Sequence, residues 1–300
     1  MKLLDFGLLR VTKPRAAPNE RPDPPGTGIA SAARSRQDGR VAGVSLTFLG
    51  TGTSVGVPVI GCGCAVCRSD DPRNRRMRSS IVMRSGGAAV LVDSGPDLRA
   101  QALREDLRAI DAVVYTHCHL DHVVGFDELR AFCWHRDEPL PVHATGSCME
   151  VLQSMFGWAF SRDNTFKGYV RPDPRIIRGA FEVGPFRITP LPVEHAAVET
   201  IGFLFEHAGA ASVAYLPDVK RIPRETMDLL RRADVLVVDA LRPTPHPTHF
   251  TIREALAAAD DVSADATWLT HLGHENDHAA LESELPPGVQ VAWDGLCIDL

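Results

Sequence analysis

Short apolar runs recur along most of the chain, and polar loops and stretches with helical spacing of apolar residues separate them. One such run, Ala112–Tyr115, is apolar throughout and predicts a buried strand. We predict strands near 45–49, 80–84, 88–93, 111–116, 140–144, 181–191, 201–206, 211–216, 234–239, 266–270 and 289–293. We predict helices near 97–107 (opened by Pro96), 147–157, 224–232, 251–259 and 278–284. Alternation of this kind indicates an α/β architecture.

The first part of the chain differs from the rest. Residues 11–43 are rich in Pro, Arg, Ala and Ser and follow neither a strand nor a helix period. Such a segment buries too little apolar surface to order itself. We interpret residues 1–43 as a disordered leader or an over-long gene start, and residues 44–300 as one folded domain.

Charge and cysteine content restrict the function classes. The net charge is −6, and because residues 1–43 carry +4, the remaining body carries −10. An acidic body argues against extended nucleic-acid binding, but not against a small phosphorylated substrate. The seven cysteines are an odd number and three of them crowd into Cys62–Cys67, so we expect thiols kept for metal in a reducing compartment.

The sequence shows neither a clear membrane-spanning segment nor a clear secretion signal. No apolar run approaches the roughly 20 residues that span a bilayer. The start, Met1–Arg10, is a poor secretion signal because Asp5 and Arg10 interrupt its short apolar core. We therefore expect a cytoplasmic protein without a membrane partner.

The segment Thr116-His117-Cys118-His119-Leu120-Asp121-His122 follows the strand near 111–116, and a helix is expected to begin at Val123. Three imidazoles and a carboxylate in six residues are difficult to explain as a polar loop. In an extended segment side chains alternate faces, so His117, His119 and Asp121 point one way while His122 reaches a neighbouring position. This arrangement suits two adjacent metal ions.

Further candidate ligands stand where later strands end. His195 follows the strand near 181–191, Asp218 closes the strand near 211–216, and His271 ends the strand near 266–270. Loops at strand ends commonly carry active-site residues, although each residue alone is equally compatible with an ordinary polar surface position.

The His117–His122 segment resembles the metallo-β-lactamase superfamily. The resemblance implies an α/β metallo-β-lactamase fold, an αβ/βα four-layer sandwich with the metal site in the cleft where two sheets meet. It implies one metal on His117, His119 and His195, a second on Asp121, His122 and His271, and Asp218 as a bridge. Two cations roughly 3.5–4 Å apart share a hydroxide nucleophile.

Two residues refine this resemblance. Iron-dependent, oxygen-reducing members usually carry Glu in place of the second histidine, so His119 favours hydrolysis with zinc or manganese. Asp93, in Leu91-Val92-Asp93-Ser94-Gly95, resembles the buried strand-end aspartate of the family. We expect it to orient a ligand imidazole; a helix cap before Pro96 is the alternative.

A second metal site is predicted by Cys62-Gly63-Cys64-Ala65-Val66-Cys67, which supplies three soft ligands in a tight turn. A tetrahedral zinc needs a fourth ligand; a buried thiol cluster is the alternative. This cluster, with Gly50–Ser54 and Gly56-Val57-Pro58 before it, resembles the phosphoribosyl 1,2-cyclic phosphate phosphodiesterases of phosphonate breakdown (PhnP-type). In that family the fourth ligand is a histidine three residues beyond a catalytic-metal ligand, which here corresponds to His274.

Two kinds of side chain are candidates for acting on a phosphodiester. His249 precedes the helix near 251–259 and matches the proposed catalytic histidine of the family, so we predict it as a general acid; His246, fixed between prolines, is placed less favourably. Arg73, Arg75, Arg76 and Arg78 form a dense basic group, and Arg78 is the preferred phosphate ligand because it adjoins the strand near 80–84. For any single one of these arginines, a solvated loop is the better explanation.

The resemblance extends over about Val44–Leu300 and implies a metal-dependent phosphodiesterase for a small sugar phosphate ester, cyclic esters included. Two divalent ions, zinc or manganese, and one structural zinc are the expected cofactors, and the family suggests a homodimer. The alternatives are a nuclease resembling tRNA 3′-processing members, a thioester or lactone hydrolase, and a non-catalytic zinc-binding module. The acidic body disfavours the nuclease, and the full ligand set disfavours the binding module.

Overall fold

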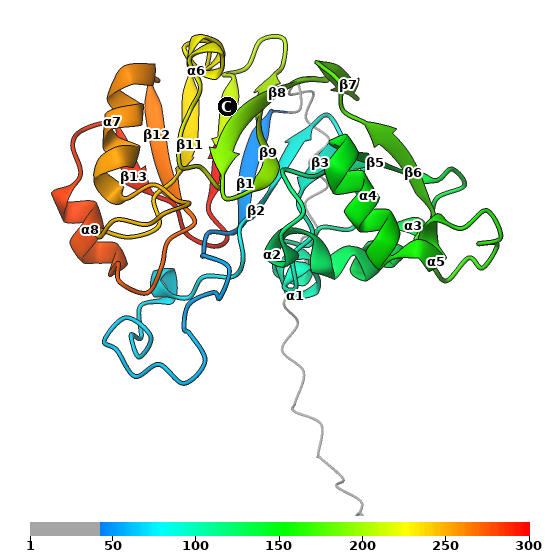
Figure 1. Ribbon diagram of the computed structural model, residues 1–300, viewed down its shortest axis with the longest axis horizontal. Coiled ribbons are helices and arrows are strands. Elements are labelled where there is room, and N and C mark those ends of the chain that lie inside the picture. The colour runs from blue at the N-terminus through cyan, green and yellow to red at the C-terminus, as the bar shows by residue number, and fades with distance from the viewer. Residues whose placement is uncertain (1–42) are drawn as a thin grey trace, which may run out of the picture. The chain divides into compact units, whose positions relative to one another are not determined.

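The computed structural model describes residues 43–300, which form two seven-stranded sheets packed face to face with helices on both outer faces (Figure 1). This is the predicted four-layer αβ/βα sandwich, so the predicted fold class is confirmed. The interpretation of residues 1–43 as a leader concerns a segment that, except for Gly43, lies outside the described residues, and it stays a prediction.

The elements follow one another in regular alternation. The strands are β1 (Ser45–Gly50), β2 (Ser80–Ser85), β3 (Ala88–Val92), β4 (Ala112–Val114), β5 (Leu140–Ala144), β6 (Pro172–Ile176), β7 (Phe181–Val183), β8 (Phe186–His195), β9 (Val198–Glu206), β10 (Val213–Leu216), β11 (Val235–Asp239), β12 (Ala266–Thr270), β13 (Val289–Val291) and β14 (Cys297–Asp299). The helices are α1 (Leu98–Arg104), α2 (Leu120–Val123), α3 (Arg130–Cys133), α4 (Gly146–Met155), α5 (Gly157–Phe160), α6 (Arg224–Leu230), α7 (Ile252–Val262) and α8 (His278–Glu284), with 3-10 turns η1 (Pro72–Asn74) and η2 (Val124–Leu129).

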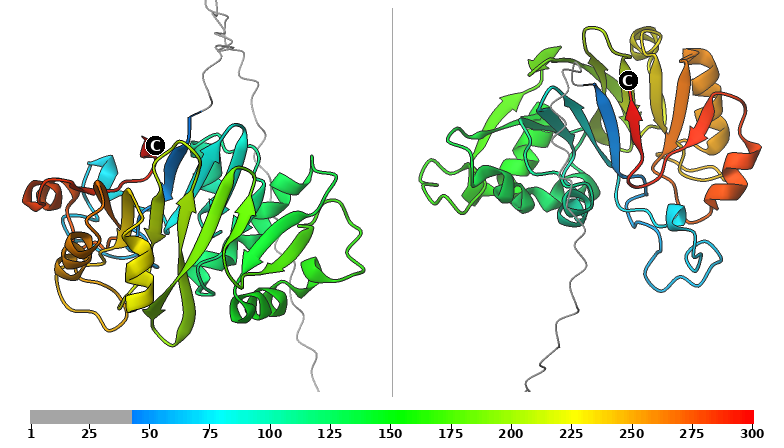
Figure 2. Two further views of the ribbon diagram at one scale, coloured as in Figure 1. Left: turned by 90° about the horizontal axis from the view of Figure 1, so that it is seen from above. Right: turned by 180° about the vertical axis from the view of Figure 1, so that it is seen from behind.

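The first sheet has the order β14-β1-β2-β3-β4-β5-β6 and the second β13-β12-β11-β10-β9-β8-β7. Helices α1–α5 cover the first sheet and α6–α8 the second, and the last strand, β14, lies beside β1 (Figure 2). Among residues 43–300, no helix combines the length and the apolar character that crossing a membrane requires.

Apolar side chains fill all three spaces between the layers. In β2, Ile81 and Met83 pack between the two sheets, while Val82 points the other way and packs under the helices of the first sheet. A strand buried on both faces needs apolar residues at successive positions, which explains the continuous runs in the sequence.

The structure departs from the predicted elements in several places, of which three affect the reasoning. The predicted strand at 181–191 is wrong as a single element, because Gly184 at φ 54° turns the chain between β7 and β8. Edge strand β6 was not predicted, since its two prolines, Pro172 and Pro174, hide it. Helix α1 begins at Leu98 with Asp97 as its N-cap, so Pro96 lies before the helix rather than inside its first turn.

Strand direction brings the candidate ligands together. Strands β3 to β6 run parallel in the first sheet, and β10 to β13 run parallel in the second. The backbone N–H of Ile201 in β9 donates to Thr116 O (3.0 Å), which joins the two sheets at the end of β4. The loops after β4, β10 and β12 meet at this junction, as crevices at the carboxyl ends of parallel strands commonly do.

Candidate metal centre

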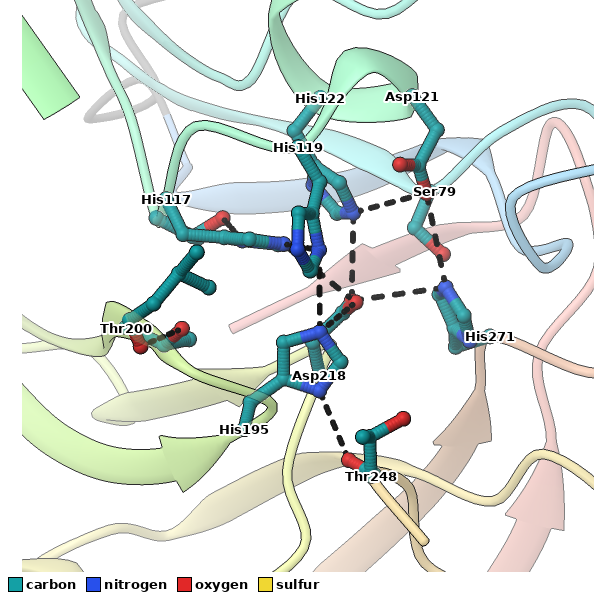
Figure 3. A network of polar contacts seen from close by, with 12 residues as sticks. Ser79, His117, His119, Asp121, His122, His195, Thr200, Asp218, Thr248 and His271 are labelled. Atoms are coloured by element: carbon teal, nitrogen blue, oxygen red, sulfur yellow. Dashed lines mark hydrogen bonds and ion pairs between the residues drawn. The ribbon is translucent and has the colours of Figure 1, made fainter. Parts of the chain in front are cut away.

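Two groups of metal-ligating side chains adjoin one another at the junction of the sheets (Figure 3). The first group is His117, His119, His195 and Asp218, and the second is Asp121, His122, Asp218 and His271. Within each group the ligating atoms lie within 4.8 Å of one another. The structure thus brings together all seven residues that the sequence predicted as ligands of the catalytic metals.

Asp218 belongs to both groups because one of its carboxylate oxygens faces the first group and the other oxygen faces the second group. Oδ2 lies 3.7 Å from His117 Nε2 and 3.5 Å from His195 Nε2. Oδ1 lies 3.3 Å from His122 Nε2 and 3.5 Å from His271 Nε2. A carboxylate in this position can bridge two cations.

The local geometry of the histidine segment differs from the predicted one. His119 is the N-cap of α2 and has an extended backbone, but Asp121 and His122 lie in the first turn of that helix, which begins at Leu120 rather than at Val123. The prediction that Asp121 shares a face of an extended strand with His117 and His119 is therefore wrong. The helical turn is what carries Asp121 and His122 to the second group.

The donor atoms fit a divalent cation. Ligands about 2.1 Å from a tetrahedral zinc are about 3.4 Å from one another. His119 Nδ1 lies 2.9 Å from His117 Nε2 and 3.2 Å from His195 Nε2. In the second group, His122 Nε2, Asp218 Oδ1 and His271 Nε2 are buried without a hydrogen-bond partner among the described residues. An unsatisfied buried polar atom costs about 1–3 kcal/mol, so three together indicate a ligand.

The electrostatics point in the same direction. Burial lowers the pKa of His117 and of His195, which keeps both imidazoles neutral, the form that binds a metal. Burial also acts on His122, but the carboxylates of Asp218, Asp121 and Asp93 outweigh it and hold the pKa of His122 well above its ordinary value. The carboxylates thus favour positive charge here, whether a proton or a metal ion carries it.

Other groups fix the orientation of the candidate ligands. Asp93 Oδ2 lies 2.7 Å from His122 Nδ1, and the same carboxylate accepts hydrogen bonds from the N–H and the hydroxyl of Thr116, both at 2.9 Å. His195 Nδ1 lies 2.8 Å from Thr248 O. Asp93 therefore contacts His122, one of the candidate ligands, and its role in orienting a metal ligand stays a prediction. The alternative of a helix cap is wrong, because the N-cap of α1 is Asp97.

His249 lies between the two groups and is tied to a residue that the sequence analysis missed. Its ring is stacked on His271 (centroids 4.6 Å apart, 14° between planes) and lies 4.6 Å from the His195 ring. Its Nδ1 lies 2.8 Å from Asp239 Oδ2, and Asp239 Oδ1 lies 3.8 Å from His271 Nδ1. Asp239 ends an apolar strand, as does Asp218, and this shared position was the signal available in the sequence.

The cysteine loop forms a third group with His274, as predicted. His274 Nδ1 lies 3.2 Å from the Sγ of Cys62 and 3.6 Å from the Sγ atoms of Cys64 and Cys67. Sulfur and nitrogen ligands of a tetrahedral zinc are separated by about 3.5 Å. A hydrogen bond from the backbone N–H of Cys67 is the main reason why the pKa of Cys64 is lowered to about 6. A thiolate is therefore available at Cys64.

Arg78 lies near the second group but is already paired. Its guanidinium forms an ion pair with Asp97 (3.1 Å) and donates to Ser54 O (3.2 Å). It lines a cavity of about 430 Å³ together with Arg75, Arg76 and Arg104, among other residues. None of these contacts tests the predicted phosphate-binding role, which stays a prediction.

Comparison with known proteins identifies the family. The family model described as the beta-lactamase superfamily domain matches residues 88–272, a stretch that contains all seven side chains of the two groups. The chain belongs to the beta-lactamase superfamily.

Within the superfamily, the most informative match is a solved structure described as a new diphosphatase from the PhnP family. It is 39% identical, with a TM-score of 0.79, and the match covers 86% of this chain and 97% of that one. The resemblance to PhnP-type proteins is thereby confirmed. A ribonuclease Z of Mycobacterium sp. (strain KMS) is 28% identical over 258 residues, which are 76% of this chain and 84% of the relative.

A third similar protein is named for a different activity. An octanoyltransferase of Porphyromonas gingivalis is 35% identical over 262 residues, which are 83% of this chain but 50% of that protein. The chain thus spans about half the length of this relative, and the relative's name assigns no activity to the matched half. Superfamily membership and the buried His and Asp groups together support a metal-dependent hydrolase.

Proposed function

We propose that this protein is a metal-dependent hydrolase that cleaves a phosphodiester bond in a small sugar phosphate ester, cyclic esters included. The observation that carries the proposal is the position of Asp218, whose two carboxylate oxygens face two separate histidine groups. In this proposal His117, His119 and His195 would hold one divalent ion, Asp121, His122 and His271 would hold another, and Asp218 would contact both.

Two divalent ions, zinc or manganese, would acidify water and stabilise the charge that develops on a phosphoryl group. The chain's own contribution is to hold the ligand rings in place. Asp93 anchors His122 through its Nδ1, and Thr248 O anchors His195 through its Nδ1, which leaves the Nε2 atoms directed at Asp218. Such outer contacts fix the ring orientation and the tautomer.

His249 is the proposed proton donor for the leaving oxygen. His249 Nδ1 lies 2.8 Å from Asp239 Oδ2, so a hydrogen bond there would orient the ring and leave Nε2 to carry the proton that is transferred. The ring lies against His195 and His271, one from each donor group, and this position beside both groups supports the proposed role.

The third group is proposed as a structural zinc site formed by Cys62, Cys64, Cys67 and His274. Three thiolates close to one another persist as zinc ligands where the environment is reducing, which supports the cytoplasm as the location. His274 follows His271 by three residues, so the zinc loop and the proposed catalytic site share one short segment.

A second candidate substrate is a phosphoanhydride. The 39% identical PhnP-family structure is described as a diphosphatase, and an anhydride presents the same anionic phosphoryl group to the two ions. Cleavage of long RNA is less well supported, because residues 44–300 carry a net charge of −10 despite the similarity to ribonuclease Z.

The substrate class can be tested with purified protein loaded with zinc or manganese. Bis(p-nitrophenyl) phosphate represents a phosphodiester, ADP-ribose a phosphoanhydride, and p-nitrophenyl octanoate an acyl ester. The proposal expects chelator-sensitive hydrolysis of the first that exceeds hydrolysis of the other two. Rapid ester cleavage without diesterase activity would refute it, and faster ADP-ribose cleavage would establish the second candidate.

A further inference from the structure

Two apolar side chains are exposed directly beside the proposed catalytic site. Leu120 lies between His119 and Asp121 and is 60% exposed, and Val124 is 41% exposed. The backbone N–H of Val124 donates to Leu120 O, so the two residues are one helical turn apart and share a face of that turn. A single exposed apolar residue is ordinary, but this pair adjoins residues of both donor groups.

Buried side chains and close backbone packing fix the turn that carries Leu120 and Val124. Val123 and Phe126 are fully buried in the core under the first sheet. A Cβ at Gly125 would lie 2.0 Å from Gly95 O, and a Cβ at Gly95 would lie 2.1 Å from Asp121 O, so neither site admits a side chain. Local packing therefore keeps Leu120 and Val124 exposed, and a small rearrangement of the turn cannot bury them.

A third exposed apolar side chain, Val55, lies in the loop next to Arg78. The Cβ position of Gly95 is 3.5 Å from Arg78 Cβ, and the Cβ position of Gly56 is 3.4 Å from Arg78 Nη1. Arg78 thus adjoins Gly95 and also the loop that carries Val55, which is 54% exposed and lines the same cavity as Arg78.

From these observations we infer that Leu120 and Val124, with Val55 near Arg78, contact an apolar part of the substrate. The substrate would then carry an aromatic or aliphatic substituent beside the bond that is cleaved. Leu120 is flanked in the chain by His119 and Asp121, one from each donor group, so it offers an exposed apolar side chain at the edge of the proposed site. The identity of the cleaved bond rests on the proposed function.

The test compares two phosphodiesters that share a leaving group: bis(p-nitrophenyl) phosphate, with an aryl substituent, and methyl p-nitrophenyl phosphate, with a methyl. For each variant the ratio of the two kcat/KM values is measured, so that intrinsic reactivity cancels between variants. Leu120→Ser should lower the aryl-over-methyl ratio about tenfold, mainly through KM, with metal content unchanged. Val124→Ser should lower it less. The matched control is Leu103→Ser, because Leu103 is 67% exposed on α1.

A binding measurement provides a readout independent of turnover. Calorimetry should show that wild type prefers phenylphosphonate to methylphosphonate and that Leu120→Ser loses this preference. Unchanged ratios in Leu120→Ser, or an equal shift in Leu103→Ser, would overturn the inference. If wild type cleaves neither diester, the proposed function fails, and the phosphonate preference alone then decides whether Leu120 contacts an apolar group.

Discussion

His249 Nδ1 lies 2.8 Å from Asp239 Oδ2, and the ring of His249 is stacked on that of His271. The pair connects α7, which begins just after His249, to the end of β11. The capping box of α7, in which Thr251 and Glu254 exchange hydrogen bonds, fixes the start of the helix and thereby the position of His249.

The proposed role of His249 as a proton donor can be tested by comparison with its neighbour His246. His249→Gln should lower kcat about 100-fold because the proton donor is lost, while metal content stays at the wild-type value. The matched control is His246→Gln, since the two rings are only 5.1 Å apart but His246 Nδ1 contacts Thr248 rather than Asp239. Equal activities in the two variants would remove His249 from the mechanism.

Asp93 is expected to strengthen metal binding through His122. Asp93→Asn removes the charge that faces His122 Nδ1 and should weaken affinity for one metal about 10- to 100-fold, as measured by competition with a chelator. Asp127→Asn is the control, because Asp127 is a surface residue paired with Arg130. If both variants bind metal as tightly as wild type does, Asp93 has no such role.

The zinc loop should stabilise the fold and also the proposed catalytic site. Cys64→Ser and His274→Ala should each lose about one zinc per chain and lower Tm by about 10 °C, with activity reduced because His271 is three residues from His274. Metal analysis and thermal unfolding measure both effects. Cys297→Ser, which alters an exposed thiol, should change neither; full zinc content in the Cys64 or His274 variant would contradict the assignment.

The close approach at Gly125 predicts a large difference between two glycine substitutions. Gly125→Ala forces a Cβ to within 2.0 Å of Gly95 O and should reduce the free energy of unfolding by about 3 kcal/mol. Gly146→Ala, at the first position of α4 with open space around it, should be neutral or stabilising by up to about 1 kcal/mol. Urea unfolding compares them, and equal stabilities would show that η2, which carries Gly125, can shift away from Gly95.

The sequence predicted the seven-residue donor set because its members either adjoin one another, as His117 and His119 do, or stand at strand ends that match a known superfamily pattern. Asp239 follows an apolar run as Asp218 does, but it was missed because the family resemblance implied a role for Asp218 and none for Asp239. The ion pair between Arg78 and Asp97 could not be predicted from the sequence either. The two residues meet only in the folded chain, and their spacing along the sequence gives no sign of it. Long-range packing likewise decides that Asp121 lies on a helical turn.

The central claim is that Asp218 joins two metal ions in one hydrolytic site. Its most direct test is metal content per chain, measured together with hydrolysis of bis(p-nitrophenyl) phosphate, for wild type and for Asp218→Ala. Two ions at the proposed catalytic site and one structural zinc predict about three metals in wild type. The variant should retain about one metal and lose diesterase activity. A variant that keeps about three metals and full activity would contradict the account.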